Sequence, residues 1–336
     1  MAKILTLGES LIRLSSDEGH RLMNASRLHL TYGGAEANVA INMAFLDHEV
    51  KYATKMPHSN GLAHNLLYHL QSFGVDCSQV LSGSGRLGSY YLETGTGLRA
   101  TNIIYDRQYS TISMMEKLEW NLDRLFEDVE LFHITGVTSA LSKSWQKMSV
   151  DLILEAKKRG VVVSFDMNYR QTMWTQKEAR KVFEQILPHV DILSAGKLDA
   201  IHFMDIIEVE GDQVNWQYYM QSIASKYSNL QYIYGTNRQM VTPNSYIMSG
   251  YLWDCKKDAG YESKTYEIMQ VVDRVGAGDS YAAAILDGIV NKKSNQETVD
   301  FGMAAGVLKH TISGDVNLFR RSEIDNFMSN ASNIVR

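Results

Sequence analysis

The feature that most constrains the fold of this chain is a regular alternation of short apolar runs and helix-type segments. Residues 4–8 form an apolar run that ends at a glycine, and Gly33-Gly34 opens a segment with small and apolar residues at helical spacing. A second strand pattern follows at 50–54, and a helical pattern then runs from 62 to about 74. Strand, helix, strand, helix in this order is typical of a parallel sheet covered by helices on both faces. The sequence therefore predicts an α/β fold.

The same alternation resumes after residue 130, and a β-rich interruption precedes it. Within 80–115, five glycines separate short runs rich in Tyr, Thr and Ile, which predict antiparallel hairpin strands. Together with residues 11–32 these strands are expected to form a small β-sheet lid on the main domain. Further strands are expected at 131–135, 161–165, 191–194 and 231–234, a β-rich piece at 240–270, and helices at 142–159, 176–187, 216–228 and 296–311.

Composition limits the classes of function. The 336 residues are 45% hydrophobic and 21% charged, with three prolines and no low-complexity tract, so one large domain over residues 1–336 is expected. The formal net charge is −5 and no long Lys/Arg block occurs, which argues against nucleic acid or an anionic membrane as a partner. Cys77 and Cys255 have no metal-type spacing, and no window approaches the roughly 20 apolar residues of a membrane span, so a cytoplasmic protein is predicted.

Gly276-Ala277-Gly278-Asp279 precedes an apolar run that is expected to be helical. Two glycines around one alanine let three consecutive backbone amides point toward an anion at the helix N-terminus. Asp279 closes the turn, where it could cap the helix or accept a proton from a hydroxyl. An isolated motif of this kind is also compatible with a simple strand-to-helix turn.

Other polar clusters fall where strands are expected to end, which is where ligands bind in such sheets. Gly33-Gly34 would let a ligand approach the backbone, and Asn38 could bind sugar hydroxyls or be a buried structural residue. Arg107 and Arg170 could bind a carboxylate or phosphate, although Arg107 could instead pair with the adjacent Asp106.

Several common nucleotide and metal motifs are excluded. The G-x-G-x-x-G at 83–88 precedes a strand pattern instead of the helix that a dinucleotide fingerprint needs. The sequence contains no G-x-x-x-x-G-K-[ST], no H-R-D with D-F-G and no H-E-x-x-H, which excludes a P-loop, a protein kinase and the common zinc enzymes.

Taken together, the glycine pair followed by Asn38 and the Asp273 to Asp279 motif, with Arg274 in the usual Thr position, resemble the ribokinase-like (PfkB family) sugar kinases over the full length. Within that family the chain is most similar to 2-keto-3-deoxygluconate kinases, on the segments 86–91, 104–107, 166–170 and 313–315. The resemblance implies a three-layer α/β/α sandwich with a mostly parallel central sheet and a small β-sheet lid.

The resemblance also implies roles for individual residues. Asp279 would be the catalytic base, Gly276, Ala277 and Gly278 would form the anion hole, and Gly276 and Gly278 would also contact the nucleotide. The sugar-acid site would be lined by Gly33, Gly34, Asn38, Tyr90, Tyr105, Arg107, Arg170 and Asp279, and the nucleotide site by Thr236, Asn237, Arg238 and Lys309.

Two positions depart from the family pattern. The family's N-x-x-E is replaced by Gly196-Lys-Leu-Asp199, so that Asp199 is the one remaining candidate for the metal. The nucleotide strand carries Arg238, which could supply the cation that phosphates need.

The function implied is ATP-dependent phosphorylation of the terminal hydroxyl of 2-keto-3-deoxy-D-gluconate, with Mg²⁺ and with a monovalent cation left open as a further cofactor. Two alternatives remain: a kinase of the same fold for another sugar or sugar acid, such as fructose or ribose, and a non-catalytic sugar or nucleotide sensor. Lid strands with exposed edges are expected to pair two copies, giving a homo-oligomer through the lid.

Overall fold

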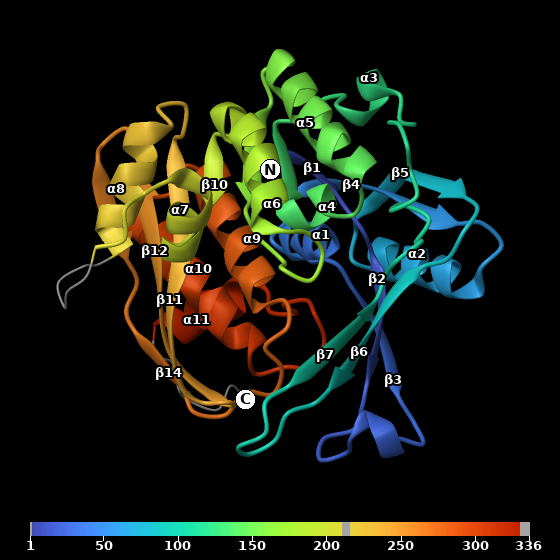
Figure 1. The fold of residues 1–336 in the computed structure, drawn as a ribbon. Helices are drawn as coiled ribbons and strands as arrows, with labels where there is room; N and C mark the ends of the chain where they lie inside the picture. Colours follow the sequence, from blue (N-terminus) through green and yellow to red (C-terminus); the bar gives the residue numbers. More distant parts are fainter. Residues whose placement is uncertain (1, 210–215, 330–336) are drawn as a thin grey trace.

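A mostly parallel sheet lies between two layers of helices, which confirms the predicted architecture (Figure 1). The computed structural model describes residues 2–209 and 216–329. Among these residues, ten strands form the main sheet in the order β13-β12-β11-β10-β9-β8-β1-β4-β5, with β14 paired to β12. They are β1 (Lys3–Leu7), β4 (Glu49–Pro57), β5 (Asp76–Gly83), β8 (Leu131–Thr135), β9 (Val162–Asp166), β10 (Ile192–Ser194), β11 (Tyr232–Thr242), β12 (Ser245–Asp254), β13 (Ala259–Glu262) and β14 (Tyr266–Ile268).

The strand β1 sits at the middle of the parallel part, because it pairs with both β4 and β8. Ile4 lies opposite Val50 on one side and Leu131 on the other. Successive side chains of β1 enter opposite cores: Leu5 and Leu7 pack in one cluster and Ile4 in the other. A strand buried on both faces is mostly apolar, and here the one polar side chain of the run at 4–7, Thr6, donates to the Glu36 carbonyl, which is why the run was recognisable in the sequence.

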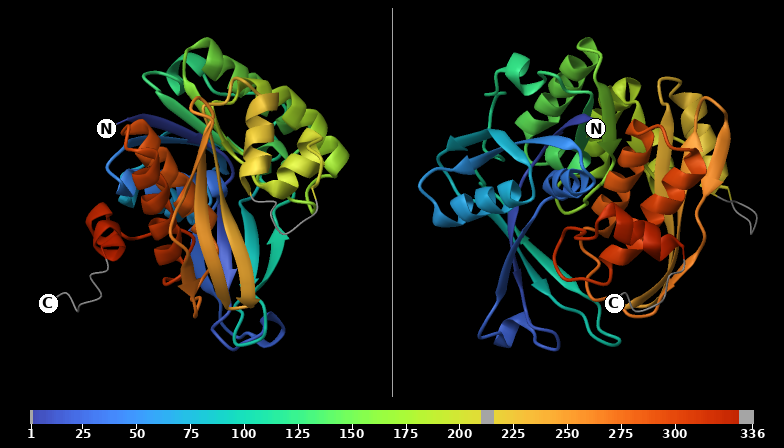
Figure 2. Two further views of the ribbon diagram at one scale, coloured as in Figure 1. Left: turned by 90° about the vertical axis from the view of Figure 1, so that its left-hand side faces the viewer. Right: turned by 180° about the vertical axis from the view of Figure 1, so that it is seen from behind.

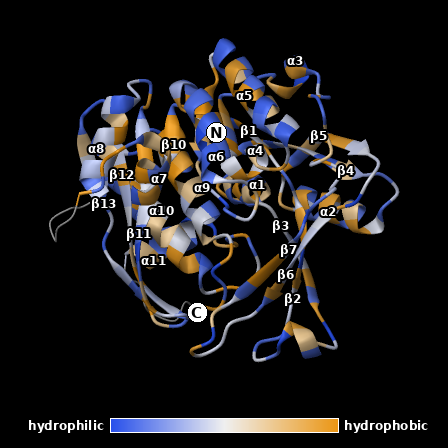
Figure 3. Cartoon of the chain, in the orientation of Figure 1, coloured by the Kyte–Doolittle hydropathy of each residue, from blue (hydrophilic) through white to orange (hydrophobic). Residues whose placement is uncertain are grey.

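The helices divide between the two faces (Figure 2). Apolar side chains of α3 and of α5 to α8 pack into one core cluster, and those of α1 and α2, with most of those of α9 and α10, pack into the clusters on the other face. Figure 3 shows the hydrophilic faces of α5 and α8 turned outward, as expected for helices that cover a sheet. The helices are α1 (Ala35–Phe45), α2 (Gly61–Ser72), α3 (Leu122–Leu125), α4 (Gly136–Ser139), α5 (Lys143–Lys158), α6 (Gln176–Ile186), α7 (Lys197–Met204), α8 (Trp216–Lys226), α9 (Ala277–Val290), α10 (Asn295–Lys309) and α11 (Arg321–Met328), with short 3₁₀ turns η1 (Leu22–Asn24) and η2 (Leu187–His189).

A separate small sheet projects from one end of the main sheet (Figure 1). Its strands run in the order β3-β2-β6-β7 and are β2 (Leu11–Ser15), β3 (His29–Gly33), β6 (Gly88–Glu93) and β7 (Asn102–Asp106). Of the range 80–115 expected for a lid, residues 88–93 and 102–106 carry strands of this sheet. Residues 80–83 instead complete β5 of the main sheet, where they pair in parallel with β4. The central pair, β2 and β6, is also parallel, so the small sheet is not built from hairpins alone.

The strand β11 is longer than the expected run at 231–234. It continues to Thr242 and forms a long antiparallel pair with β12. Its second half has four consecutive exposed residues at 238–241 and no alternating or buried apolar pattern, so this part is a strand because β12 supplies hydrogen-bonding partners. Among the residues that the structure describes, no helix has the length and hydropathy needed to cross a bilayer.

Replacement of Phe165 by alanine should destabilise the protein strongly. Phe165 is fully buried in β9, and its ring packs against Phe183 with a centroid distance of 5.8 Å. Removal of a buried aromatic side chain typically costs about 3–5 kcal/mol in the free energy of unfolding. Chemical denaturation should show this loss for Phe165→Ala, while Leu154→Ala on α5, whose side chain is 41% exposed, should change stability by less than about 1 kcal/mol. Equal effects of the two substitutions would contradict the position assigned to β9.

Candidate active site

The start of α9 is shaped by two glycines. Gly276 precedes the helix in a left-handed conformation, with φ of 79°, and a Cβ atom there would lie 1.7 Å from the carbonyl oxygen of Asp315. Both conditions require glycine at this position. Gly278 is exposed, and a Cβ atom there would meet open space. The turn is therefore closed against the protein at Gly276 and open to solvent at Gly278.

The amides of this turn are only partly free. The Ala277 amide donates to the Arg274 carbonyl at 3.3 Å, so one of the three amides expected to face an anion has an internal partner. Within the described part of the chain, the amides of Gly276 and Gly278 have no acceptor. Unpaired amides at a helix N-terminus are suited to bind an anion, because the helix dipole adds partial positive charge at the same place.

Asp279 lies in the first turn of α9 and is held by Asn38 of α1. The Asn38 side-chain amide donates to Asp279 Oδ2 at 2.7 Å. Burial raises the pKa of Asp279 to about 7, the charges of Asp166 and Asp315 act in the same direction, and the hydrogen bond from Asn38 opposes the rise. A carboxylate with a pKa near neutrality is suited to take a proton from a hydroxyl.

The Asn38 side chain has one hydrogen-bonding atom left for a ligand. Its Oδ1 is buried and has no donor among the described residues, although Nδ2 is engaged with Asp279. A buried acceptor without a partner is costly and marks a place where a ligand hydroxyl can donate. Asn38 was expected to line a sugar site, and the structure places it directly beside Asp279.

Arg170 is an exposed cation close to three carboxylates at the carboxyl ends of the parallel strands. It follows β9, and its guanidinium donates to the neighbouring Tyr169 carbonyl at 3.2 Å. No carboxylate lies within ion-pair distance of it in the described residues. Its positive charge nevertheless lowers the pKa values of Asp166, Asp199 and Asp279, although burial raises them by more. Arg170 therefore lies near all three carboxylates.

The glycine pair Gly33-Gly34 makes close contacts within the protein. A Cβ atom on Gly33 would lie 1.9 Å from Asp315 Oδ2, and one on Gly34 would lie 2.2 Å from the Glu9 carbonyl oxygen. Gly34 also has φ of 152°, which disfavours other residues. These close contacts with Glu9 and Asp315 account for both glycines and fix the entry to α1, and the expected approach of a ligand to their backbone stays a prediction.

A buried arginine that the sequence did not single out connects the small sheet to the turn before α9. Arg13 of β2 is 4% exposed and forms ion pairs with Asp273 and with Asp315, the latter at 2.7 Å. The Tyr90 hydroxyl of β6 donates to the other oxygen of Asp315 at 2.6 Å. Tyr90 was expected to line the sugar-acid site, but it is 3% exposed and its hydroxyl is used in this network.

Arg107 pairs with Glu9 and not with the adjacent Asp106. Its Nε donates to Glu9 Oε2 at 2.7 Å, and Ser110 donates to the other Glu9 oxygen. Asp106 is bound instead by Arg86, through two hydrogen bonds of 2.7 Å. Of the two guanidinium groups expected to bind a substrate carboxylate, only Arg170 lacks a carboxylate partner in the described chain. Tyr105 is 45% exposed, and the centre of its ring lies 5.6 Å from Arg107 Cζ.

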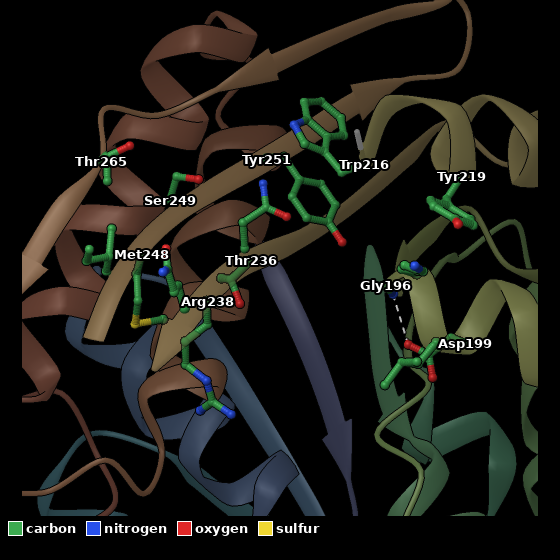
Figure 4. Close-up of a pocket in the computed structure, with 15 residues that line it drawn as sticks. Gly196, Asp199, Trp216, Tyr219, Thr236, Arg238, Met248, Ser249, Tyr251 and Thr265 are labelled. Carbon is green, nitrogen blue, oxygen red and sulfur yellow. Dashed lines mark hydrogen bonds between the residues drawn. The ribbon is translucent and has the colours of Figure 1, made fainter. Parts of the chain in front are cut away.

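Four of the residues assigned to the nucleotide or the metal line one cavity of about 700 Å³ between β11, β12, α7 and α8. They are Asp199, Thr236, Asn237 and Arg238. Figure 4 shows Thr236 and Arg238 extending from β11 on one side, with Gly196 and Asp199 on the other. The Arg238 guanidinium is exposed and lies over the Tyr246 ring at 5.4 Å. The cavity has a size typical of small-molecule sites.

Lys309 does not join this cavity. It is fully buried at the end of α10, and its Nζ donates to the carbonyl oxygens of Asp273 and Ile312 at 3.3 and 3.2 Å. Its ammonium group faces the protein interior, so the structure gives no support to the expected contact between Lys309 and the nucleotide.

Asp199 is compatible with a Mg²⁺ site that is completed by phosphates. Its Oδ2 accepts from the Gly196 amide at 2.9 Å, and burial raises its pKa to about 6. No group of three or more His, Cys, Asp or Glu side chains in the described residues could hold a metal by itself. Mg²⁺ is commonly held by one or two carboxylates together with substrate phosphates and water, so Asp199 and the nearby Asp166 fit that requirement.

Asp279 has a raised pKa and lies beside free amides at a helix N-terminus, and a cavity lined by Arg238 is nearby. Phosphoryl transfer to a hydroxyl needs such a base, such amide donors and such a cation. A family model for the pfkB family carbohydrate kinases matches residues 1–206 and 249–319. The chain belongs to this family. It is therefore a carbohydrate kinase, and its fold is the ribokinase-like one that the sequence resemblance implied.

Individual relatives are similar over nearly the whole chain. A 2-dehydro-3-deoxygalactonokinase from Haloferax volcanii is 29% identical over 326 residues, which cover 96% of each protein. The crystal structure of a PfkB family carbohydrate kinase from Listeria grayi is 39% identical, with a TM-score of 0.93 and coverage of 98% of this chain and 100% of that one. The structure of 2-dehydro-3-deoxygluconokinase from Thermotoga maritima is 33% identical, with the same TM-score and coverage.

The hydrogen bond between Asn38 and Asp279 predicts a shift in pH dependence. If Asp279 is the base, it must be deprotonated to accept a proton, and kcat/KM should then fall as the pH drops below about 7. Because the Asn38 hydrogen bond lowers the pKa of Asp279, Asn38→Ala should move this acidic limb to higher pH. The control is Asn42→Ala, one turn later on α1, where the side chain contacts the Asn317 amide and not Asp279. An acidic limb that Asn38→Ala leaves in place would contradict the assignment.

Proposed function

We propose that this carbohydrate kinase transfers the γ-phosphoryl group of ATP to the terminal hydroxyl of a 2-keto-3-deoxy sugar acid, with 2-keto-3-deoxygluconate or its galactonate epimer as substrate. The observation that carries the proposal is Arg170, an exposed guanidinium without a carboxylate partner in the described residues, near the carboxylate that acts as base. The names of the Haloferax and Thermotoga relatives, which both denote kinases of such acids, support the same substrate class.

Arg170 supports an acidic substrate for an electrostatic reason. An anion that enters beside Asp166, Asp199 and Asp279 meets three groups of its own sign when they are ionised, and Arg170 is the cation that offsets them. A guanidinium binds a carboxylate through two parallel hydrogen bonds, which also fixes orientation. A neutral sugar would leave these donors without an ionic partner, and sites built for a polar group reject analogues that lack it.

Asp279 and Asn38 define where the reacting hydroxyl lies. Asp279 accepts the proton as the hydroxyl oxygen attacks the γ-phosphorus, and the bond between that phosphorus and the β,γ-bridging oxygen breaks. Asn38 keeps Asp279 in position through Nδ2 and accepts from a second hydroxyl of the sugar through Oδ1. The free amides of Gly276 and Gly278 stabilise charge that develops on the transferred group, as in other oxyanion holes.

The cavity along β11 is suited to the triphosphate. Arg238 and Thr236 lie on one side and Asp199 on the other, which brings a cation and a candidate metal ligand to the same cavity. Mg²⁺, when bound to the phosphates, neutralises part of their charge and orients them. Asp199 and Asp166 would hold it together with the phosphate oxygens.

Replacement of Asp279 by asparagine should abolish turnover and retain binding. Removal of a positioned base typically lowers kcat by about 10²- to 10⁴-fold. Calorimetric titration should show that Asp279→Asn still binds the sugar acid and ATP, because the side chain keeps its size and its place beside Asn38. Asp151→Asn on the exposed face of α5 is the control and should keep full activity. Substantial turnover by Asp279→Asn would remove Asp279 as the base.

A substrate panel tests the substrate class. ADP release should be fastest with 2-keto-3-deoxygluconate or 2-keto-3-deoxygalactonate and much slower with fructose or ribose. Arg170→Gln should lower kcat/KM for the keto acid by about 10- to 100-fold, since hydrogen bonds to charged groups contribute roughly 1.5–3 kcal/mol, and should change the slow reaction with neutral sugars little. Arg159→Gln at the end of α5, where the arginine pairs with Glu155 and Asp123, is the matched control.

Two other outcomes of the substrate panel would contradict the proposal. A preference for fructose or ribose would replace the proposed substrate by a neutral sugar. Tight binding of ATP and sugar acid with no ADP release in the presence of Mg²⁺ would indicate a sensor that has lost catalysis.

A further inference from the structure

Lys309 is a buried cation that the catalytic steps described above do not use. It is the last residue of α10 and its side chain has no exposed surface. Its Nζ contacts two backbone carbonyl oxygens, those of Asp273 and Ile312, at 3.3 and 3.2 Å. In the chain as described, no carboxylate lies within ion-pair distance of it, in contrast to Arg13 nearby.

The two carbonyl groups belong to the two loops that surround the start of α9. Asp273 precedes Gly276 by three residues, and Ile312 precedes Asp315, whose carbonyl oxygen abuts Gly276. The Asp273 carboxylate accepts from the Val275 amide at 3.0 Å and from the Gly314 amide at 3.1 Å. Lys309 therefore holds together the two loops whose separation sets the position of the anion-binding amides.

Ligation by carbonyl oxygens without a direct carboxylate contact is how proteins replace the hydration shell of a potassium ion. A buried ammonium requires the same compensation, because desolvation of a charge is costly. Burial lowers the pKa of Lys309, and the negative charges of Asp273 and Asp315 oppose that change. The surroundings of Nζ thus suit a monovalent cation that is enclosed between two loops.

We propose that Lys309 is a positioning residue whose ammonium group acts as a built-in monovalent cation, so that this kinase orders its anion hole without added K⁺. The inference rests on membership of the kinase family and not on the identity of the sugar acid. The alternative is that Lys309 only caps the C-terminus of α10, since lysine near a helix end often binds the last carbonyl groups. A cap would contribute to stability and would leave the chemical step unchanged.

The first experiment uses the wild-type protein and compares KCl, NH₄Cl, NaCl and choline chloride at matched ionic strength. Activity, measured as ADP release with the best substrate of the panel, and the melting temperature should be the same in all four salts within experimental scatter. The melting curves need no substrate, so failure of the proposed substrate would not obscure this test. A several-fold higher activity in KCl, or a rise in melting temperature specific to KCl, would overturn the proposal.

The second experiment uses Lys309→Met, which keeps the length of the side chain and removes the charge. It should lower kcat by about 10-fold or more, because loss of a single oxyanion-hole donor costs about 10²- to 10³-fold and the loops here are displaced without being removed. The KM values for ATP and sugar should change much less. Lys51→Met is the matched control, because Lys51 Nζ also binds only carbonyl groups, those of Arg124, Leu125 and Glu127, at the opposite end of the sheet. It should lower stability and leave kcat unchanged.

The third experiment uses Lys309→Ala, which empties the space of the side chain and leaves both carbonyl groups in place. KCl or NH₄Cl should raise its melting temperature and recover part of its kcat, whereas choline chloride should do neither. A Lys309→Met protein with reduced stability and normal kcat would show a structural cap and overturn the proposal. So would a folded Lys309→Ala protein that K⁺ and NH₄⁺ do not restore. If Lys309→Ala does not fold, the wild-type salt panel and Lys309→Met decide the question.

Discussion

The buried guanidinium of Arg13 is the interaction on which the geometry of the site depends. It leaves water almost completely, and burial by itself would lower its pKa, but the adjacent charges of Asp315 and Asp273 raise the pKa instead. Asp273 lies just before α9 and Asp315 follows α10, whereas Arg13 belongs to the small sheet. Loss of one partner would leave a buried charge uncompensated, which is strongly destabilising. The small sheet and the glycine-rich turn before α9 are thus connected by the same ionic network.

Most of the α/β architecture could be predicted because each element has a local signal. The strand β8 was expected at 131–135 and is found there, since an apolar strand buried on both faces has no alternation to confuse its limits. A capping box of Thr175 and Glu178 precedes α6, and this pattern marks the N-terminus of the helix in the sequence itself. The second half of β11 has no such signal, because it is a strand only by virtue of its pairing with β12. Pairing between segments that lie far apart cannot be recognised from one segment alone.

The same distinction separates the parts of the site that were predictable from those that were not. Asp279, Asn38 and Arg170 stand at ends of elements, where ligands of parallel sheets bind, and the structure brings Asn38 to Asp279 across 241 positions of the chain. Arg13 gave no signal, because an arginine in an alternating strand is expected to face water. The adjacent residues Asp106 and Arg107 were candidates for a mutual ion pair. In the structure Asp106 pairs with Arg86, and Arg107 pairs with Glu9. Sequence proximity was a poor guide because β7 ends at Asp106, and the chain leaves the strand at Arg107 toward Glu9.

The orientation of the Asn38 amide has a stereochemical consequence for the proposed reaction. With Nδ2 committed to Asp279, the remaining Oδ1 is free to accept a hydrogen bond from a second hydroxyl near the reacting alcohol. In the proposed reaction, a terminal alcohol with a hydroxyl on the adjacent carbon would suit both residues at once, so the pair would favour a vicinal diol. The gluconate and galactonate forms of a 2-keto-3-deoxy acid differ at the fourth carbon and share the diol at the fifth and sixth. Under the proposed function, Asn38 and Asp279 would therefore not distinguish the two epimers, and discrimination would come from groups that contact the middle of the carbon chain.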